Sequence, residues 1–176
     1  MQIITSHSEA LKCLDNNVTG GDLYQQLSTY TEDAYKTSKQ LQDLEFDGII
    51  CILRAALPMA LTLYKLSNKK MGFISARRRE DLSIEINYKK VPEFKKPLLV
   101  DAWVATGNTV VEVAKELNIK EINLFCLIAS KQAINLIKPK NLIVGHIADD
   151  MTDKSYIIPP HPFKPRDGGD DMFYCN

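Results

Sequence analysis

The sequence predicts an α/β fold with a doubly wound, mainly parallel sheet. Short apolar runs that are typical of buried strands alternate with stretches of helical periodicity between residues 45 and 150. Polar residues come directly after three of these runs, at Arg54, Arg77 and Asp101. Ligands bind such sheets at the carboxyl ends of the strands, so we expect these three side chains to lie at one edge.

The N-terminal segment, residues 1–44, is predicted to be helical. Residues 1–20 carry little pattern, and the Gly-Gly-Asp sequence that follows is typical of a loop and a helix cap. Apolar residues then recur near helical spacing over residues 22–44. This spacing predicts one amphipathic helix before the sheet begins.

Two strands and a polar excursion are predicted next. Residues 49–53 read IICIL, a run suited to a strand buried on both faces. Residues 55–66 are predicted to form a loop and helix, and residues 71–76 a second strand. Residues 77–96 are polar, with alternating apolar positions that predict a two-stranded excursion from the main sheet. Those positions are Leu82, Ile84, Ile86 and Tyr88.

The second half of the core repeats the alternation of strand and helix. The run LLV at residues 98–100 predicts a buried strand, and a helical pattern covers residues 110–117. Residues 121–128 are predicted to form a strand, 130–137 a helix, and 141–146 a further strand. Strands separated by helices in this way are joined by right-handed crossovers into a parallel sheet.

The segment 98–113, LLVDAWVATGNTVVEV, places a small hydroxylic loop between a strand and a helix. Free backbone N–H groups and the positive end of the helix dipole converge at such a point, so it suits a phosphate. No GxxxxGK[ST] motif occurs, which argues against a nucleoside triphosphatase. An acid at a strand end and a Thr at a helix start are also frequent in α/β proteins, so this segment alone leaves a purely structural role open.

Composition excludes several classes of protein. The 176 residues predict one domain, and the 22 basic and 22 acidic residues cancel, so nothing global points to nucleic acid or a membrane. The start has no signal pattern and no apolar run approaches the ~20 residues of a membrane span, which predicts a soluble, cytoplasmic protein. The four cysteines form no CxxC and the three histidines lack metal-ligand spacing, which argues against a zinc site.

Four segments, the last of which holds two motifs, follow one another along the chain in the same order as in the uracil phosphoribosyltransferases, a group of type I phosphoribosyltransferases, and resemble them. DAWVATGNT at residues 101–109 resembles their DPMLATGGS/T loop, and ILRAALPMA at 52–60 resembles ILRAGLGM. RRREDL at 77–82 aligns with YRDEETL. Near the end, YIIP at 156–159 and DGGD at 167–170 match GYIIPG and GDAGD. The resemblance covers roughly residues 45–174.

The resemblance implies a phosphoribosyltransferase core at residues 45–150, with a small hood formed by residues 77–96 and 151–176. It implies transfer of the phosphoribosyl group of phosphoribosyl diphosphate to a nucleobase. Uracil, giving UMP and pyrophosphate in pyrimidine salvage, is the first expectation. The implied partners are therefore these two substrates, and a homodimer is a further expectation.

The same resemblance assigns roles to individual residues. Asp101 and Asp167 are the implied catalytic residues, and Mg²⁺ is the implied cofactor, held through the substrate and not directly by the protein. The implied ligands of phosphoribosyl diphosphate are Arg54, Arg77, Asp101, Ala105, Thr106, Gly107, Asn108, Thr109 and Asp167. The implied base-binding residues are Tyr156, Ile157, Arg166, Asp167 and Gly168.

Departures from the family pattern keep two alternatives open. A proline-rich stretch at residues 159–166 replaces a short glycine-rich one, which favours a different base or a base-like metabolite. Ala56, Pro58 and Asn108 replace family glycines, which favours a non-catalytic protein that binds phosphoribosyl diphosphate or a nucleotide. Asn is the non-glycine residue that best tolerates a left-handed backbone, so we expect position 108 to keep the loop's shape.

Overall fold

A computed structural model describes residues 2–5, 21–79 and 83–149 of the chain. The strands within these ranges are β1 (Gln2–Thr5), β2 (Gly48–Leu53), β3 (Lys70–Arg78), β4 (Ile84–Lys90), β5 (Pro97–Val104), β6 (Asn123–Ser130) and β7 (Asn141–Ala148). The helices are α2 (Gly21–Thr37), α3 (Lys39–Asp43), α4 (Leu57–Ser67), α5 (Asn108–Glu116) and α6 (Lys131–Ile137).

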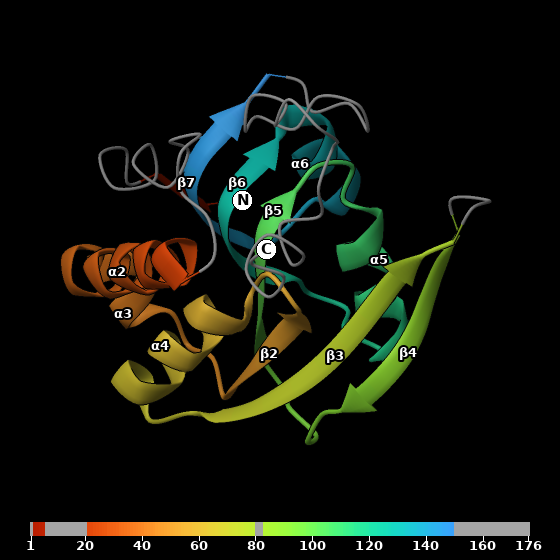
Figure 1. The fold of residues 1–176 in the computed structure, drawn as a ribbon, viewed down its shortest axis with the longest axis horizontal. Coiled ribbons are helices and arrows are strands. Elements are labelled where there is room, and N and C mark those ends of the chain that lie inside the picture. Colours follow the sequence, from red (N-terminus) through yellow and green to blue (C-terminus); the bar gives the residue numbers. More distant parts are fainter. Residues whose placement is uncertain (1, 6–20, 80–82, 150–176) are drawn as a thin grey trace.

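The described strands form one sheet in the order β1-β7-β6-β5-β2-β3-β4 (Figure 1). Every neighbouring pair is parallel except β3 with β4, which is antiparallel. The central strands consist almost entirely of buried residues, as expected for a sheet covered on both faces. The predicted mainly parallel α/β fold is confirmed.

Helices cover both faces of this sheet (Figure 1). On one face, α2, α3 and α4 pack over a core cluster that contains Leu27, Met59 and Phe125. On the other face, α5 and α6 pack over a second cluster that contains Leu99 and Val110. Within the described ranges, no helix combines the length and apolar character needed to cross a lipid bilayer.

The helical region before the sheet differs from the prediction of one helix over residues 22–44. It is divided at Ser38, whose backbone is extended and whose hydroxyl accepts a hydrogen bond of 3.1 Å from the N–H of Leu41. Ser38 therefore caps a new, short helix, α3. Apolar spacing runs through the break because both helices bury the same side, which explains why periodicity alone did not reveal it.

Both edges of the sheet also contain features that the sequence did not predict. β1 pairs in parallel with β7, although residues 1–20 showed little pattern. At the other edge, the predicted two-stranded excursion is a hairpin whose first strand is β3 itself, extended to Arg78. Its second strand, β4, becomes the edge strand of the main sheet, and the pairing shifts register between Ser75 and Ala76.

The connection from β4 to β5 is fixed where β2 begins. The side chain of Phe94 lies so close to Gly48 that a Cβ added there would come within 2.1 Å of the ring. The carboxylate of Asp47 accepts hydrogen bonds from the backbone N–H groups of Lys95 and Lys96, at 2.7 and 2.9 Å. These contacts hold the starts of β2 and β5 side by side, in the register Gly48 to Pro97.

Candidate functional site

Between the neighbouring strands β2 and β5, the connections that follow the strands lead toward opposite edges of the sheet; we call this the reversal. β2 continues through α4 to β3 on one side, whereas β5 continues through α5 to β6 on the other. The two strands pair only from Gly48 to Cys51 and from Pro97 to Val100, and beyond Val100 β5 pairs with β6 alone. In open α/β sheets this reversal, at the carboxyl ends of the strands, is the place where ligands bind.

The first side of the reversal is the turn between β2 and α4. Arg54, which is half-buried, follows β2 directly, and the Leu53–Arg54 peptide bond is cis. The carbonyl of Arg54 accepts a hydrogen bond of 3.0 Å from the N–H of Leu57, where α4 begins. Ala56 and Pro58 are buried, and the Ala56 methyl group belongs to the core cluster under α2 and α4. These two replacements of family glycines therefore pack inward.

The second side of the reversal contains Asp101, which lies within β5 because the strand continues to Val104. Its side chain is 9% exposed, and in the sheet it lies opposite Cys126 of β6. Burial, and then the negative charge of Asp101, raises the pKa of Cys51 to about 12, and the same two causes raise that of Cys126. The charge of Asp101 thus affects the pKa of a thiol on each neighbouring strand, β2 and β6.

The loop after β5 leads into the N-terminus of α5. Gly107, the residue before the helix, has φ of 85°, and its carbonyl accepts the first helical hydrogen bond, 3.0 Å from the N–H of Val111. Gly107 offers no side chain to cap this helix end, and the first turn of α5 contains no acid. The helix dipole therefore favours an anion at this end, with no negative charge in the first turn to oppose it.

The left-handed residue of this loop is Gly107, not Asn108. Asn108 is the first residue of α5 and is absent from the residues with positive φ in the described chain. A Cβ on Gly107 would come within 3.0 Å of Ile137 and 3.2 Å of Ala133, both on α6. The family glycine replaced by Asn108 is thus at a position that needs no special backbone, whereas Gly107 is constrained by both φ and space.

Ser130 is a residue near the loop to which the sequence assigned no role beyond starting a helix. Its fully buried hydroxyl donates to the carbonyl of Ala105 at 2.5 Å and accepts from the N–H of Ala133 at 2.8 Å. The serine at a helix start was the available signal, since Ser is a preferred cap. Its bond to Ala105, 25 residues earlier in the chain, required the structure.

The arginines of the hairpin lie on the neighbouring strand, β3. Arg77 is exposed, lies within β3 and is opposite Glu85 of β4. Arg79 binds Glu85 through two contacts, from Nη2 at 2.8 Å and from Nε at 3.1 Å. The hydrogen bond from Arg79, and last the charge of Arg77, lower the pKa of Glu85. Arg79 is therefore engaged within the hairpin.

The structure thus assembles part of the predicted site. Arg77 lies on β3, Arg54 follows β2, and Asp101 lies on β5. These three strands are neighbours in the sheet, and the three residues lie toward the same edge. The predicted phosphate loop, residues 105–109, spans the β5–α5 junction at that edge. The predicted residues Tyr156, Ile157, Arg166, Asp167 and Gly168 lie outside the described residues.

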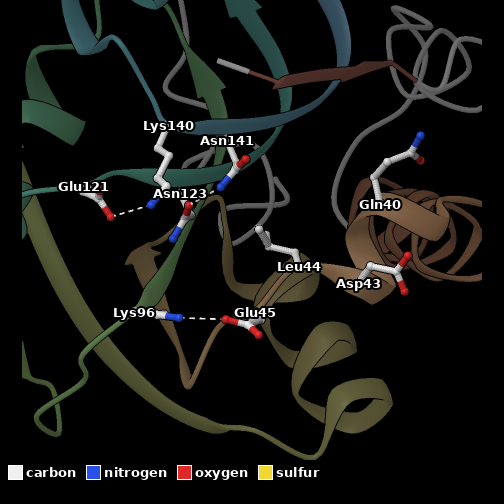
Figure 2. Close-up of a pocket in the computed structure, with 9 residues that line it drawn as sticks. All are labelled: Gln40, Asp43, Leu44, Glu45, Lys96, Glu121, Asn123, Lys140 and Asn141. Carbon is white, nitrogen blue, oxygen red and sulfur yellow. Dashed lines mark hydrogen bonds and ion pairs between the residues drawn. The ribbon is translucent and has the colours of Figure 1, made fainter.

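A cavity of about 340 Å³ lies at the opposite edge, where β5, β6 and β7 begin (Figure 2). Four of its five charged groups bind one another: Lys96 pairs with Glu45 at 2.7 Å and Lys140 with Glu121 at 2.6 Å. The amide of Asn141 donates to Asn123 at 2.8 Å. Since these groups are satisfied by the cavity's own lining, we assign the candidate site to the carboxyl edge.

The described residues contain no group of three or more His, Cys, Asp or Glu side chains able to hold a metal ion. Of the two predicted catalytic acids, Asp101 lies at the carboxyl edge, and Asp167 lies outside the described residues. One carboxylate suits Mg²⁺, which usually keeps several waters and takes its remaining ligands from substrate phosphates. The residues present therefore fit a metal that arrives with a phosphorylated ligand.

The sequence matches the family model described as "Uracil phosphoribosyltransferase" over residues 7–170. The chain belongs to the uracil phosphoribosyltransferase family. The uracil phosphoribosyltransferase of Methanococcus maripaludis is 34% identical in an alignment of 124 residues that covers 63% of this chain and 54% of that protein. The chain spans about half the length of the curated relatives it matches.

Solved structures agree with this membership of the uracil phosphoribosyltransferase family at the level of the fold. A protein from Aquifex aeolicus superposes with a TM-score of 0.79 at 22% identity, covering 98% of each chain. Purine phosphoribosyltransferase from Pyrococcus horikoshii superposes with a TM-score of 0.51 at 16% identity, covering 95% of this chain and all of that one. The predicted type I phosphoribosyltransferase fold is confirmed.

We predict that Gly107→Ala lowers the free energy of unfolding by about 1–2 kcal/mol, because an alanine would be strained at this φ and crowded by α6. Asn118→Gly is the control, since Asn118 also has positive φ but is exposed, and its effect should stay within about 0.5 kcal/mol. Urea titration followed by circular dichroism measures both. A Gly107→Ala protein as stable as the parent would contradict the described loop.

Cys51 should resist alkylation in the folded protein at pH 9, where the thiol of the unfolded chain is half ionised. Because the pKa of Cys51 is raised to about 12, the fold favours the neutral thiol. The contribution of Cys51 to the free energy of unfolding is therefore complete below pH 9 and is lost as pH rises toward 12. Iodoacetamide labelling and mass spectrometry of the Cys51 peptide, with and without urea, measure the protection. Equal rates in the two conditions would show that Cys51 is accessible in the fold.

Proposed function

We propose that the protein transfers the phosphoribosyl group of phosphoribosyl diphosphate to a nucleobase. The observation that carries this proposal is the reversal between β2 and β5, with a cation on one side and a carboxylate and open helix end on the other. Family membership supports the same reaction class. The proposal covers the activity, both substrates and the metal.

The 5′-phosphate would lie at the N-terminus of α5. Backbone N–H groups of the loop, together with the hydroxyls of Thr106 and Thr109, are suitable donors, and the helix dipole favours the negative charge. The first turn of α5 contains no acid to oppose it. Ala105, Gly107 and Asn108 would contribute through their backbone.

The other parts of the substrate would extend across the sheet edge. Asp101 would accept hydrogen bonds from the ribose hydroxyls, because a carboxylate offers acceptors only. Arg54 and Arg77 would bind the pyrophosphate, whose oxygens match the planar fork of a guanidinium. The side chains of Ala56 and Pro58 are buried, so these replacements of family glycines leave the turn beside Arg54 compatible with this binding.

The chemistry needs no covalent nucleophile from the protein. Departure of pyrophosphate builds positive charge at the anomeric carbon while negative charge grows on the leaving group. Arg54 and Arg77 would stabilise the leaving group, and Asp101 would hold the sugar in place, so positioning and electrostatics supply the rate enhancement. Mg²⁺, when bound with the substrate, would offset further pyrophosphate charge. By the resemblance, Asp167 would favour the cationic sugar.

Uracil is the proposed acceptor, with UMP as the product, and the names of the curated relatives support this choice. The base-binding residues implied by the resemblance are Tyr156, Ile157, Arg166, Asp167 and Gly168, outside the described residues. The proline-rich stretch at residues 159–166 is the reason to test other bases too. A homodimer and a cytoplasmic location stay predictions from sequence.

The first test of the proposal is calorimetric titration with phosphoribosyl diphosphate and Mg²⁺, followed by a pyrophosphate-release assay over a panel of bases. We expect binding, and release that depends on uracil. Release with another base but not uracil would retain the transferase and reject the proposed acceptor. Binding without release on any base would favour a regulatory protein, and no binding would reject both.

Arg54→Gln should weaken the binding of pyrophosphate about tenfold or more, because a charge-assisted bidentate contact is lost, while the fold is kept. Lys65→Gln is a matched control: it removes a cation from the last turn of α4, the helix that begins beside Arg54. Calorimetry with magnesium pyrophosphate measures both variants. Equal losses in the two would indicate a general charge effect and not a site at Arg54.

A further inference from the structure

Ser130 joins two elements that belong to different parts of the chain. Its Oγ donates to the carbonyl of Ala105, in the loop after β5, and accepts from the N–H of Ala133, in the first turn of α6. The Ser130 side chain is fully buried. The hydroxyl therefore uses its donor and one acceptor lone pair inside the protein, away from solvent.

The bond to Ala105 fixes the orientation of a peptide group in the loop. The carbonyl of Ala105 and the N–H of Thr106 belong to the same planar peptide unit, which is trans. In a trans peptide these two groups point in opposite directions. Because Ser130 binds the carbonyl from the side of α6, the N–H of Thr106 points away from α6.

A second contact between the loop and α6 supports the same arrangement. Gly107 lies so close to Ala133 and Ile137 of α6 that even a Cβ would be crowded. Residues 105–107 are thus held at both ends, by the hydrogen bond from Ser130, the cap residue of α6, at Ala105 and by close packing against α6 at Gly107. Helix α6 acts as a support for the loop that leads into α5.

We propose that Ser130 is a positioning residue for the 5′-phosphate of the substrate. It does not touch the ligand, but holds the Ala105–Thr106 peptide so that the Thr106 N–H faces the phosphate side of the loop. The inference rests on the proposed function for its ligand. Its structural part, the ordering of the loop by Ser130, holds independently of the ligand.

The experiment compares Ser130→Ala with Ser38→Ala. Ser38 is a matched control because it is also a buried serine that caps a short helix and accepts from the N–H three residues later. It caps α3, two residues of which line the cavity at the opposite edge (Figure 2). Both variants lose a helix cap and should lower the melting temperature, Ser130→Ala by more because it loses a second hydrogen bond. Only Ser130→Ala also frees the carbonyl of Ala105.

Two probes separate the parts of the ligand. NMR titration with ribose 5-phosphate reports the phosphate loop, and titration with magnesium pyrophosphate reports the arginines. Ser130→Ala should weaken ribose 5-phosphate binding about tenfold and change pyrophosphate binding less than about twofold. Ser38→Ala should change neither. Equal losses for both probes in Ser130→Ala would indicate general destabilisation and overturn the positioning role.

Hydrogen exchange of the ligand-free proteins tests the structural part separately. Ser130→Ala should speed exchange in the peptide that covers residues 104–108 more than Ser38→Ala does. Unchanged exchange in this peptide would overturn the inference even if the parent protein binds phosphoribosyl diphosphate. Faster exchange in a protein that binds no phosphoribosyl diphosphate would support the loop-ordering role of Ser130 and reject the proposed function instead.

Discussion

The candidate site depends on one structural constraint, the end of pairing between β2 and β5 at Val100. Up to that residue the two strands share a continuous ladder, held in register where they begin by Asp47 and by the contact of Phe94 with Gly48. Beyond it the connections turn to opposite sides. The turn at Arg54 and the loop at Gly107 then face the same opening in the ladder, from opposite faces of the sheet.

An anion site at α5 requires a helix end that its own side chains leave open, and such an end is less stable than a capped one. α3 and α6 illustrate the alternative, since each begins with a serine that caps it. α5 begins at Asn108, after Gly107, which offers no side-chain cap. Its loop is stabilised from outside instead, by the hydroxyl of Ser130 and by packing against α6. Stability at this point therefore comes from Ser130 and the helix that it caps, and not from a side-chain cap on α5 itself.

The sequence was informative where one local signal decides the structure. Apolar runs located the central strands, and the small loop after Asp101 located the start of α5. It was less informative where tertiary contacts decide. β1 forms because β7 offers an edge, and Gly107 has a positive φ at a place where α6 leaves no room for a side chain. Ser130 shows the same limit, since its partner Ala105 is remote in sequence.

The order of the strands also spreads the candidate charged residues along the edge of the sheet. Asp101 lies on β5, Arg54 follows β2, and Arg77 lies on β3, so the strands that carry Asp101 and Arg77 are two strand spacings apart, about 10 Å. A direct ion pair over that distance would be weak in water. An extended ligand with a sugar near β5 and a diphosphate toward β3 would satisfy each group separately. The carboxylate would therefore lie near the sugar, where positive charge develops, and the guanidinium groups near the pyrophosphate, where negative charge develops.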